Sequence, residues 1–315
     1  MPLYLRAKFL LLVGLLLPVA ASAQTPEHAV VPGTKISLIP PTGFTAARSF
    51  SGFEQPDAAA SIMISDIPGP VQQMKAGMTP AALATRGMKL LRTEPVTLNG
   101  TPATVLHVTQ SANGLLYCKQ MLMFGDATHT VLVVGTYPDG GKTVEANIRR
   151  ALLTTHYNSR LSDDTPAAEF GVDVAGTGLR FAKNLAGSLL YTTDGQVTPK
   201  GPDKAVVIVA GSLNSVEVGP SEQKAFSIQH LQQLPEGKHN RVRTISPVTV
   251  DGLSGYEIVA DGQNDKQVPE LVYQLTLFDG PTKKYYAVVG LAETQFDTRL
   301  ASFKAIARTF KRKEK

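Results

Sequence analysis

The stretch "PVTVDGLSGYEIVA" occupies residues 247–260, and a similar stretch, "PVTLNGTPATVLHV", occupies residues 95–108, which lie 152 positions earlier. Both begin with Pro-Val-Thr and continue into a two-residue turn signal, Asp251-Gly252 in one and Asn99-Gly100 in the other. Asp-Gly and Asn-Gly between runs of β-forming residues are strong signals for a hairpin. The sequence therefore predicts the same β-hairpin twice.

The likeness continues along most of the chain. Further residues that match between the two halves are Gln120 with Gln274, Phe124 with Phe278, Gly135 with Gly290, and Thr154 with Thr309. The offset between matched residues drifts only from 152 to 155, so the insertions are small. This spacing is far longer than the roughly 20–50 residues of solenoid repeats, so we interpret it as a duplicated domain.

The domain boundaries follow from the repeat. We predict a first domain at residues 24–157 and a second at residues 169–311. A polar linker, NSRLSDDTPAA, joins them at residues 158–168, and a basic tail follows at residues 312–315.

Runs of β-branched and aromatic residues, bounded by turn residues, predict the strands of each half. In the first half they lie at residues 60–67, 102–110, 116–124 and 129–136. In the second half they lie at residues 204–212, 241–250, 255–261, 271–278 and 284–292. The last four strands of the second half follow one another closely, which is typical of an antiparallel meander.

Two helices are predicted in each half. Thr79-Pro80, a cap residue followed by proline, starts one that runs to about Leu91, and Ser221 starts the corresponding helix, which runs to about Leu234. A closing helix shows apolar residues at helical spacing. These are Val144, Ile148, Ala151 and Leu152 in the first half, and Leu300, Phe303, Ile306, Ala307 and Phe310 in the second. The expected fold class is α+β, with two tandem copies of an antiparallel sheet sandwiched between helices.

This order of elements resembles the PsbP-like superfamily, a group that includes the photosystem protein PsbP, the bacterial envelope protein DcrB and a Ran-binding protein. The resemblance covers residues 30–157 and 170–311, and it rests on "VTVDGLSGYEI", "VYQLTLF" and "YYAVVGLA" followed by the closing helix. It implies an α/β/α sandwich and a non-enzymatic binding or assembly role. It carries over no catalytic residues, and a function inferred from fold analogy alone is associational.

The first 23 residues have the pattern of a secretory signal peptide. A short basic region precedes an apolar run from Phe9 to Ala20, and Ala21-Ser22-Ala23 supplies the small residues of a cleavage site. The apolar run is shorter than the ~20 residues that a membrane span needs, and no later segment is long and apolar enough. We expect cleavage before Gln24 and a periplasmic or secreted protein without a transmembrane segment; an uncleaved anchor is the alternative.

The formal net charge of +5 is concentrated at the two ends of the chain. Two positive charges lie in the signal segment and a net three in the last five residues, so the body of the chain is near neutral. This excludes a nucleic-acid-binding surface as the main function. The tail is a candidate for weak contact with an anionic surface or an acidic partner, or is simply a solvated end. The basic residues at this end of the chain are Lys311, Arg312, Lys313 and Lys315.

Motifs for cofactors and metals are weak. "GTYPDGGKT" at residues 135–143 ends like a phosphate-binding loop, but its first glycine is one residue early, so a turn that enters a helix is the better interpretation. The six histidines show no metal-ligand spacing with one another. We expect neither a cofactor nor a metal site.

The single cysteine, Cys118, excludes an intrachain disulfide and is the one candidate nucleophile. A nucleophilic role would need a nearby base and a positive environment. Its match in the other half is Val272, an ordinary strand residue, so a small packed side chain is the simpler interpretation.

Gln120 and Gln274 are the candidate binding residues inside the domains. A glutamine in the middle of a strand is not explained by strand propensity. Each could hydrogen-bond the sheet to a neighbouring loop, or line a cleft between sheet and helix.

The leading hypothesis is an exported, non-enzymatic protein with two duplicated binding domains, an adaptor for a protein partner in the cell envelope. Two alternatives remain. One is a carrier of a small apolar ligand held between sheet and helix, and the other is a hydrolase that uses Cys118.

Overall fold

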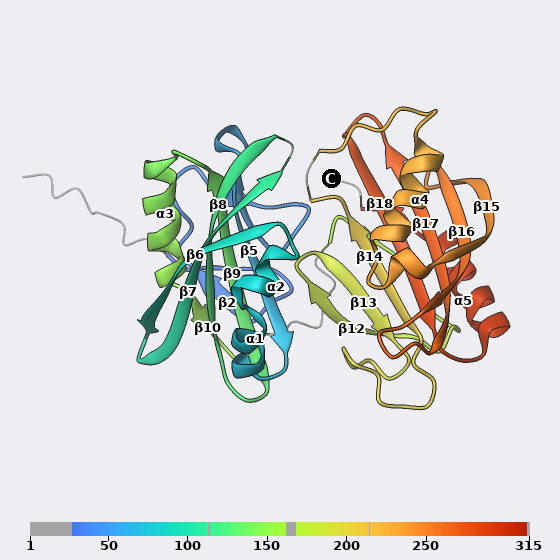
Figure 1. Ribbon diagram of the computed structural model, residues 1–315, viewed down its shortest axis with the longest axis horizontal. Coiled ribbons are helices and arrows are strands. Elements are labelled where there is room, and N and C mark those ends of the chain that lie inside the picture. Colours follow the sequence, from blue (N-terminus) through green and yellow to red (C-terminus); the bar gives the residue numbers. More distant parts are fainter. Residues whose placement is uncertain (1–26, 113, 162–167, 214, 314–315) are drawn as a thin grey trace, which may run out of the picture.

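The computed structural model describes residues 27–112, 114–161, 168–213 and 215–313. The predicted signal peptide at residues 1–23 lies outside them, as do residues 162–167 of the linker and Lys315 of the tail. Figure 1 shows two domains side by side, each built on one large twisted sheet.

Each domain contains a seven-stranded antiparallel sheet, and the two sheets have the same strand order. The first sheet has the order β3-β4-β5-β9-β8-β7-β6, with strands Thr45–Ala46, Gly52–Gln55, Ala60–Pro68, His129–Pro138, Leu115–Gly125, Thr101–Ala112 and Met88–Leu98. The second has the order β12-β13-β14-β18-β17-β16-β15, with strands Arg180–Leu185, Ser188–Thr192, Val206–Gly211, Lys284–Ala292, Pro269–Asp279, Leu253–Gln263 and Arg241–Val250. The duplicated α+β architecture that the sequence predicts is therefore confirmed.

Shorter elements complete the described chain. The α-helices are α1 (Val71–Gly77), α2 (Pro80–Ala84), α3 (Lys142–Leu153), α4 (Gln223–Gln233) and α5 (Phe296–Arg308). A three-stranded sheet contains β1 (Ala29–Val30), β2 (Ile36–Leu38) and β10 (His156–Tyr157), and β11 (Phe170–Gly171) pairs with β19 (Lys311–Arg312). Two 3-10 helices are η1 (Pro56–Ala58) and η2 (Gly237–His239).

Both predicted hairpins form. Asn99 and Gly100 have φ angles of 47° and 84°, and Asp251 and Gly252 have 53° and 73°. Positive φ at both central residues is the signature of the type I′ turn, whose twist matches that of the flanking strands. These two turns join β6 to β7 and β15 to β16.

The predicted end of the first helix is wrong. Thr79 caps α2 as expected, since its hydroxyl accepts a bond from the Ala82 amide at 3.2 Å. The helix ends at Ala84 instead of about Leu91, and β6 begins at Met88. Pairing of β6 along the whole of β7 satisfies the backbone of residues 88–98, and this long-range ladder overrides local helix propensity.

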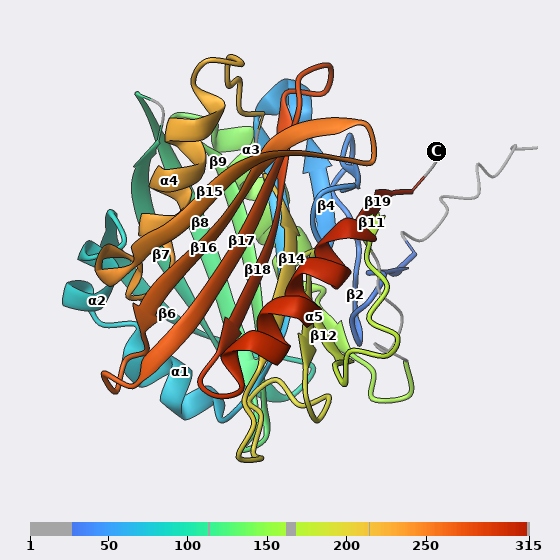
Figure 2. The ribbon, with the colours of Figure 1, turned by 90° about the vertical axis from the view of Figure 1, so that its right-hand side faces the viewer.

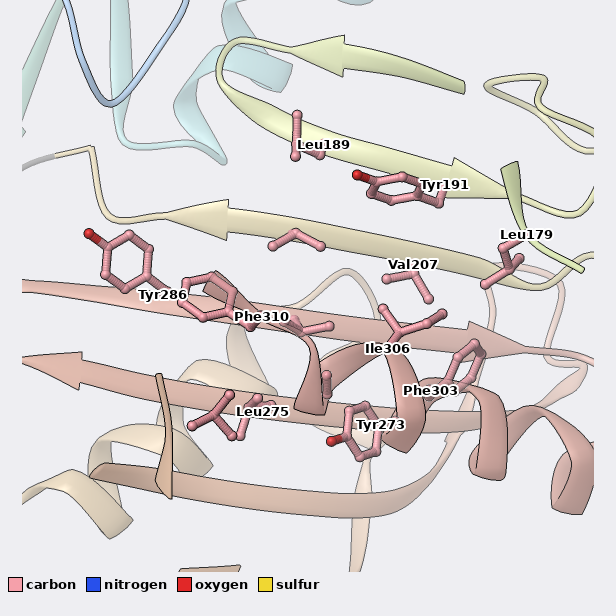
Figure 3. Close-up of a cluster of buried hydrophobic side chains, with 14 of the residues drawn as sticks. Leu179, Leu189, Tyr191, Val207, Tyr273, Leu275, Tyr286, Phe303, Ile306 and Phe310 are labelled. Carbon is pink, nitrogen blue, oxygen red and sulfur yellow. The ribbon is translucent and has the colours of Figure 1, made fainter. Parts of the chain in front are cut away.

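Each sheet lies between helices on its two faces. In the second domain α5 crosses one face (Figure 2), and its Phe303 and Ile306 pack with Tyr273 in the core that Figure 3 shows. On the opposite face, Leu231 of α4 packs against Val272. Alternate residues of a strand point to opposite faces, so β17 supplies both cores.

The first domain repeats this arrangement. Ile148 and Leu152 of α3 pack with Leu122 on one face. Leu83 of α2 packs with Met121 on the other. The predicted helix-sheet-helix layering is confirmed in both domains.

The register of the repeat differs by one residue from the match made on sequence. Gly135 and Gly290 are equivalent, because a Cβ at either would lie 2.2 Å from Ile148 or 2.5 Å from Phe303 of the closing helix. Gly135 pairs with Gln120, whereas Gly290 pairs with Tyr273. Gln120 is therefore equivalent to Tyr273 and not to Gln274. In a strand, a shift of one residue moves a side chain to the other face.

The same shift corrects two other matches. Cys118 pairs with Tyr137, and Leu271 pairs with Ala292 at the corresponding place, so Cys118 is equivalent to Leu271 and not to Val272. By the same offset, Phe124 corresponds to Leu277 and not to Phe278. The sequence alone does not reveal this one-residue shift, because both faces of these central strands are apolar.

The two domains touch through a few direct contacts. Lys183 Nζ of β12 lies 3.2 Å from the Asp66 carboxylate of β5, and Asp66 is buried. Lys284 Nζ donates to the Ser49 hydroxyl at 2.7 Å. The Gly187 turn lies so close to Ser49 that a Cβ there would be 2.5 Å from its carbonyl oxygen.

Candidate functional site

The second domain has a cavity of about 230 Å³ beside the C-terminal end of α4, and we call it the α4 cavity. Its floor is the α4 face of the sheet, where β14, β18 and β17 lie side by side. Four floor residues carry branched apolar side chains: Ile208, Val289, Leu291 and Val272.

The cavity exists because α4 covers only part of this face. The helix packs on β16 and β17, where Leu231 contacts Ile258 and Val272. Over β14 and β18 the sheet presents Ala210 and Ala287, whose small side chains leave space unfilled. Leu234, at the end of α4, forms one wall of that space. An apolar hollow of this kind is the usual form of a small-molecule site.

Glu270, on β17, is an acidic group at this apolar site. Burial raises the pKa of Glu270 to about 7, and the nearby carboxylates of Glu293 and Asp265 act in the same direction. Near neutral pH, the carboxyl group is therefore present in both forms. Protonated, it can donate a hydrogen bond to a ligand oxygen; ionised, it can accept one from a ligand hydroxyl or amine.

Gln274 connects the sheet to α4 next to this cavity. Its side chain is completely buried, and its amide nitrogen donates to the Ser227 carbonyl at 2.8 Å and to the Thr276 hydroxyl at 3.0 Å. Its amide oxygen lies 3.0 Å from Nδ1 of His230. Because an amide oxygen only accepts, Nδ1 of His230 is the donor in this contact.

His230 therefore links Gln274 to the cavity, since the imidazole also forms part of its lining. Its ring meets the Tyr285 ring edge-on, with centroids 5.4 Å apart, and Tyr285 lines the cavity as well. Gln274 thus fixes the orientation of a polar group at the site. The prediction that Gln274 takes part in binding stays open, now as an orienting role.

Gln120 lies under α3, on the face of the first sheet that corresponds to the α5 face of the second. Gln274 lies on the other face, under α4. Its amide nitrogen lies 3.4 Å from the Tyr137 hydroxyl and 3.4 Å from the Glu145 carbonyl of α3. These contacts tie the sheet to the closing helix. The structure therefore does not bring Gln120 and Gln274 into equivalent sites.

Cys118 has the properties of a protected thiol. Its sulfur donates to the Asp139 carboxylate at 3.4 Å. Burial, the hydrogen bond to Asp139 and its negative charge raise the pKa of the Cys118 thiol to about 11. The thiolate is the nucleophilic form of cysteine, so this environment opposes a nucleophilic role.

The start of the basic tail is part of the second domain. Arg312 Nε lies 2.8 Å from the Asp251 carboxylate, and Nη1 lies 2.9 Å from that of Asp279. Lys311 is exposed in β19, while the backbone amide of Lys313 donates to the Glu169 carbonyl at 2.7 Å. The charge of Arg312 is therefore compensated within the chain.

The described part of the chain contains neither a metal-binding cluster nor a membrane-spanning helix. Across those residues, no cluster of three or more His, Cys, Asp or Glu side chains is arranged to hold a metal ion. None of the helices described is long and apolar enough to cross a membrane.

No protein-family model and no curated protein match this sequence. Among solved structures, LpqN, involved in cell envelope biogenesis of Mycobacterium tuberculosis, is 14% identical and has a TM-score of 0.35, with 45% of this chain and 82% of LpqN covered. The immunity protein TplEi of the T6SS from Pseudomonas aeruginosa is 15% identical with a TM-score of 0.34, covering 86% and 98%. Likenesses this low identify neither a ligand nor a partner for this chain.

The α4 cavity itself carries no sequence signature. His230 and Glu270 lie 40 positions apart in segments that read as an ordinary helix and an ordinary strand. Only the packing of α4 against part of the sheet shows that both line one hollow.

Proposed function

We propose that this chain is an exported, non-enzymatic binding protein of two PsbP-like domains, and that its second domain holds a small apolar ligand in the α4 cavity. The observation that supports this is the apolar cavity itself, with Glu270 and His230 among its polar groups. Dry apolar cavities of about 150 Å³ bind benzene. A cavity of about 230 Å³ has room for a somewhat larger molecule.

The chemistry of the lining defines the ligand class. Valine, leucine, isoleucine and alanine side chains on the floor favour an aliphatic or aromatic body. Glu270 favours a hydroxyl or amine at one end and disfavours a carboxylate when it is ionised itself. We therefore expect a neutral or cationic amphiphile.

Calorimetric titration of the mature protein with octan-1-ol tests the proposal. Ala210 lies in the lining, so Ala210→Phe fills the cavity and is expected to weaken binding at least tenfold. Ala301 is exposed on α5, and Ala301→Phe is the matched control that keeps full binding. Equal affinity of both variants for octan-1-ol, or no binding by the unmodified protein, would contradict the proposal.

A protein partner in the cell envelope is the second candidate function. It is supported by the duplication, which presents two related surfaces on one chain. Crosslinking in an envelope fraction tests it, and the variant Lys311→Ala removes an exposed charge without touching the Arg312 ion pairs. A partner retained by this variant supports docking through the domains, and a partner lost with it supports docking through the basic end of the chain.

A further inference from the structure

The first domain has a cavity of its own, of about 480 Å³, and we call it the β8 cavity. Its floor is the α1–α2 face of the first sheet, where Ser61 of β5, Thr136 of β9 and Lys119 of β8 are neighbours across the ladder. Phe50 of the first domain forms part of its wall, and Leu213, from the second half of the chain, forms another part.

The two cavities occupy equivalent places in the repeat. Lys119 pairs with Thr136, and in the second domain Val272 pairs with Leu291 at the corresponding position. Because β8 and β9 match β17 and β18 in register, Lys119 replaces Val272 and Thr136 replaces Leu291. The same fold therefore leaves the same part of the sheet uncovered twice, with an apolar floor in one domain and a polar, charged floor in the other.

The reason for the hollow is the position of the helices. α1 and α2 pack over the C-terminal half of β8, where Leu83 and Met78 contact Met121 and Met123. They do not reach Lys119, which precedes this cluster on the same face of the strand. In the second domain, α4 leaves the corresponding end of β17 open in the same way.

Lys119 is the unusual residue in this cavity. Its side chain is half-buried, and no hydrogen bond or ion pair to it occurs within the described part of the chain. Burial lowers the pKa of the Lys119 amine, and the Glu54 carboxylate at the same cavity forms no ion pair with it. A charged amine removed from water without a partner is costly, and a bound anion would offset that cost.

Other groups in the cavity restrict the kind of anion. Glu54 also lines it, so the two ionisable groups of opposite sign leave the site without a net charge. A second negative charge on a ligand would be repelled by Glu54, which disfavours phosphate-like dianions. Phe50, Met63 and Leu213 offer apolar surface, and the side chains of Tyr117 and Thr136 offer hydroxyl groups.

We propose that the β8 cavity is a second ligand site, which binds a small monocarboxylic acid with its carboxylate at the Lys119 amine and its apolar body against Phe50, Met63 and Leu213. This site is separate from the α4 cavity, and it holds or fails independently of the function proposed for that cavity. The duplication would then have produced two sites of opposite preference, one for neutral or cationic molecules and one for anions.

The test is a titration of the ¹⁵N-labelled mature protein with sodium octanoate at pH 7, followed through the backbone amides of Lys119 and Thr136. Saturable shifts at these amides are expected in the unmodified protein. Lys119→Met keeps the aliphatic stem and is expected to weaken octanoate binding at least tenfold. Lys89→Met, at an exposed position on the same sheet, is the matched control and should bind as the unmodified protein does.

Two further measurements keep the proposal falsifiable if Lys119→Met folds poorly. Octanoate should raise the pKa of the Lys119 amine, observed by NMR in the unmodified protein, because the carboxylate stabilises the charged form. Glu54→Gln should tighten octanoate binding by removing a repulsive charge. No change in the amine pKa, or equal octanoate affinity of Lys119→Met and the unmodified protein, would overturn the proposal.

Discussion

Lys119 of the first domain and Val272 of the second occupy the same position in the repeat, one residue before the strand residue that pairs with the helix-facing glycine. Gln120 pairs with Gly135 and Tyr273 pairs with Gly290, which fixes this equivalence. The duplicated fold has thus placed an amine and an isopropyl group at the floor of corresponding cavities. This difference between Lys119 and Val272 is the basis of the different ligand preferences that we propose for the two cavities.

The helix-facing glycines should be intolerant of any side chain. In Gly290→Ala the new Cβ would lie 2.5 Å from the Phe303 ring, and we expect a loss of about 2 kcal/mol in the free energy of unfolding. Urea denaturation measures it. Gly280→Ala, where nothing lies within 4 Å, is the control and should change stability little. Equal midpoints for the two variants would contradict this role.

Glu270 should make the protein less stable at higher pH. Its pKa of about 7 lies above the ordinary value of 4.5, so the folded state binds its proton more tightly than the unfolded state. Stability is therefore lost as pH rises from about 4.5 through 7. Glu270→Gln should be more stable than the unmodified protein at pH 8 by about 1 to 2 kcal/mol, after allowance for partial exposure, and should match it near pH 4.

Chemical denaturation at several pH values gives this comparison directly. Glu217→Gln is a suitable control, because Glu217 is 78% exposed in a surface ion pair with Lys283. It should show no stabilisation that grows between pH 5 and pH 8. A Glu270→Gln variant that behaves in the same way would refute the raised pKa.

Arg312 should contribute to stability through Asp251 and Asp279. Removing it in Arg312→Ala leaves the buried Asp279 carboxylate without its cation, and we expect a loss of about 2 kcal/mol near neutral pH. Lys311→Ala, at the exposed neighbouring position, should cost little. Thermal unfolding of the two variants compares them, and equal losses would show that the ion pairs contribute nothing.

The effect of Arg312→Ala should also depend on pH. Burial disfavours the ionised form of Asp251, but hydrogen bonds from Arg312 outweigh it and hold the pKa of Asp251 below its ordinary value of 3.8. The stability from this pair is therefore present above about pH 3.8 and is lost as pH falls further. The difference between variant and unmodified protein should shrink in strong acid.

Cys118 should react slowly with thiol reagents in the folded protein. A pKa of about 11, against an ordinary 9.0, reduces the thiolate at pH 8 about a hundredfold, and the half-buried position of the sulfur restricts access of the reagent. Labelling with 5,5′-dithiobis(2-nitrobenzoate) in native buffer and in urea measures the ratio. Asp139→Asn should lower the pKa of the thiol and speed native labelling. Equal rates in native buffer and in urea would restore Cys118 as a candidate nucleophile.

Much of the fold could be predicted because the signals are local. The Asp251-Gly252 and Asn99-Gly100 turns need positive φ at two successive residues, and those residue types allow it. The strands flanking them and the closing helices follow from the spacing of apolar residues, which recur every two residues in a strand and about every 3.6 residues in a helix. The end of α2 could not be predicted, since pairing of residues 88–98 with β7 decides it.

The candidate sites could not be predicted from the sequence either, because they also depend on contacts between distant segments. Gln120 and Gln274 look equivalent in a linear comparison, yet the ladders place them on opposite faces. Arg312 reads as part of a solvated tail, yet Asp251 and Asp279 from two hairpins meet it. Lys119 and Glu270 have no motif around them at all.

The sequence by itself determined the duplication, the hairpins, most of the strands and the helix-sheet-helix layers, because turn chemistry and hydrophobic periodicity act over a few residues. Only the tertiary structure decided which side chains share a face, where the helices leave the sheets uncovered, and which charges are compensated. Those properties depend on strand register and on contacts between distant segments. A single-residue shift in register reverses the face of every side chain in a strand.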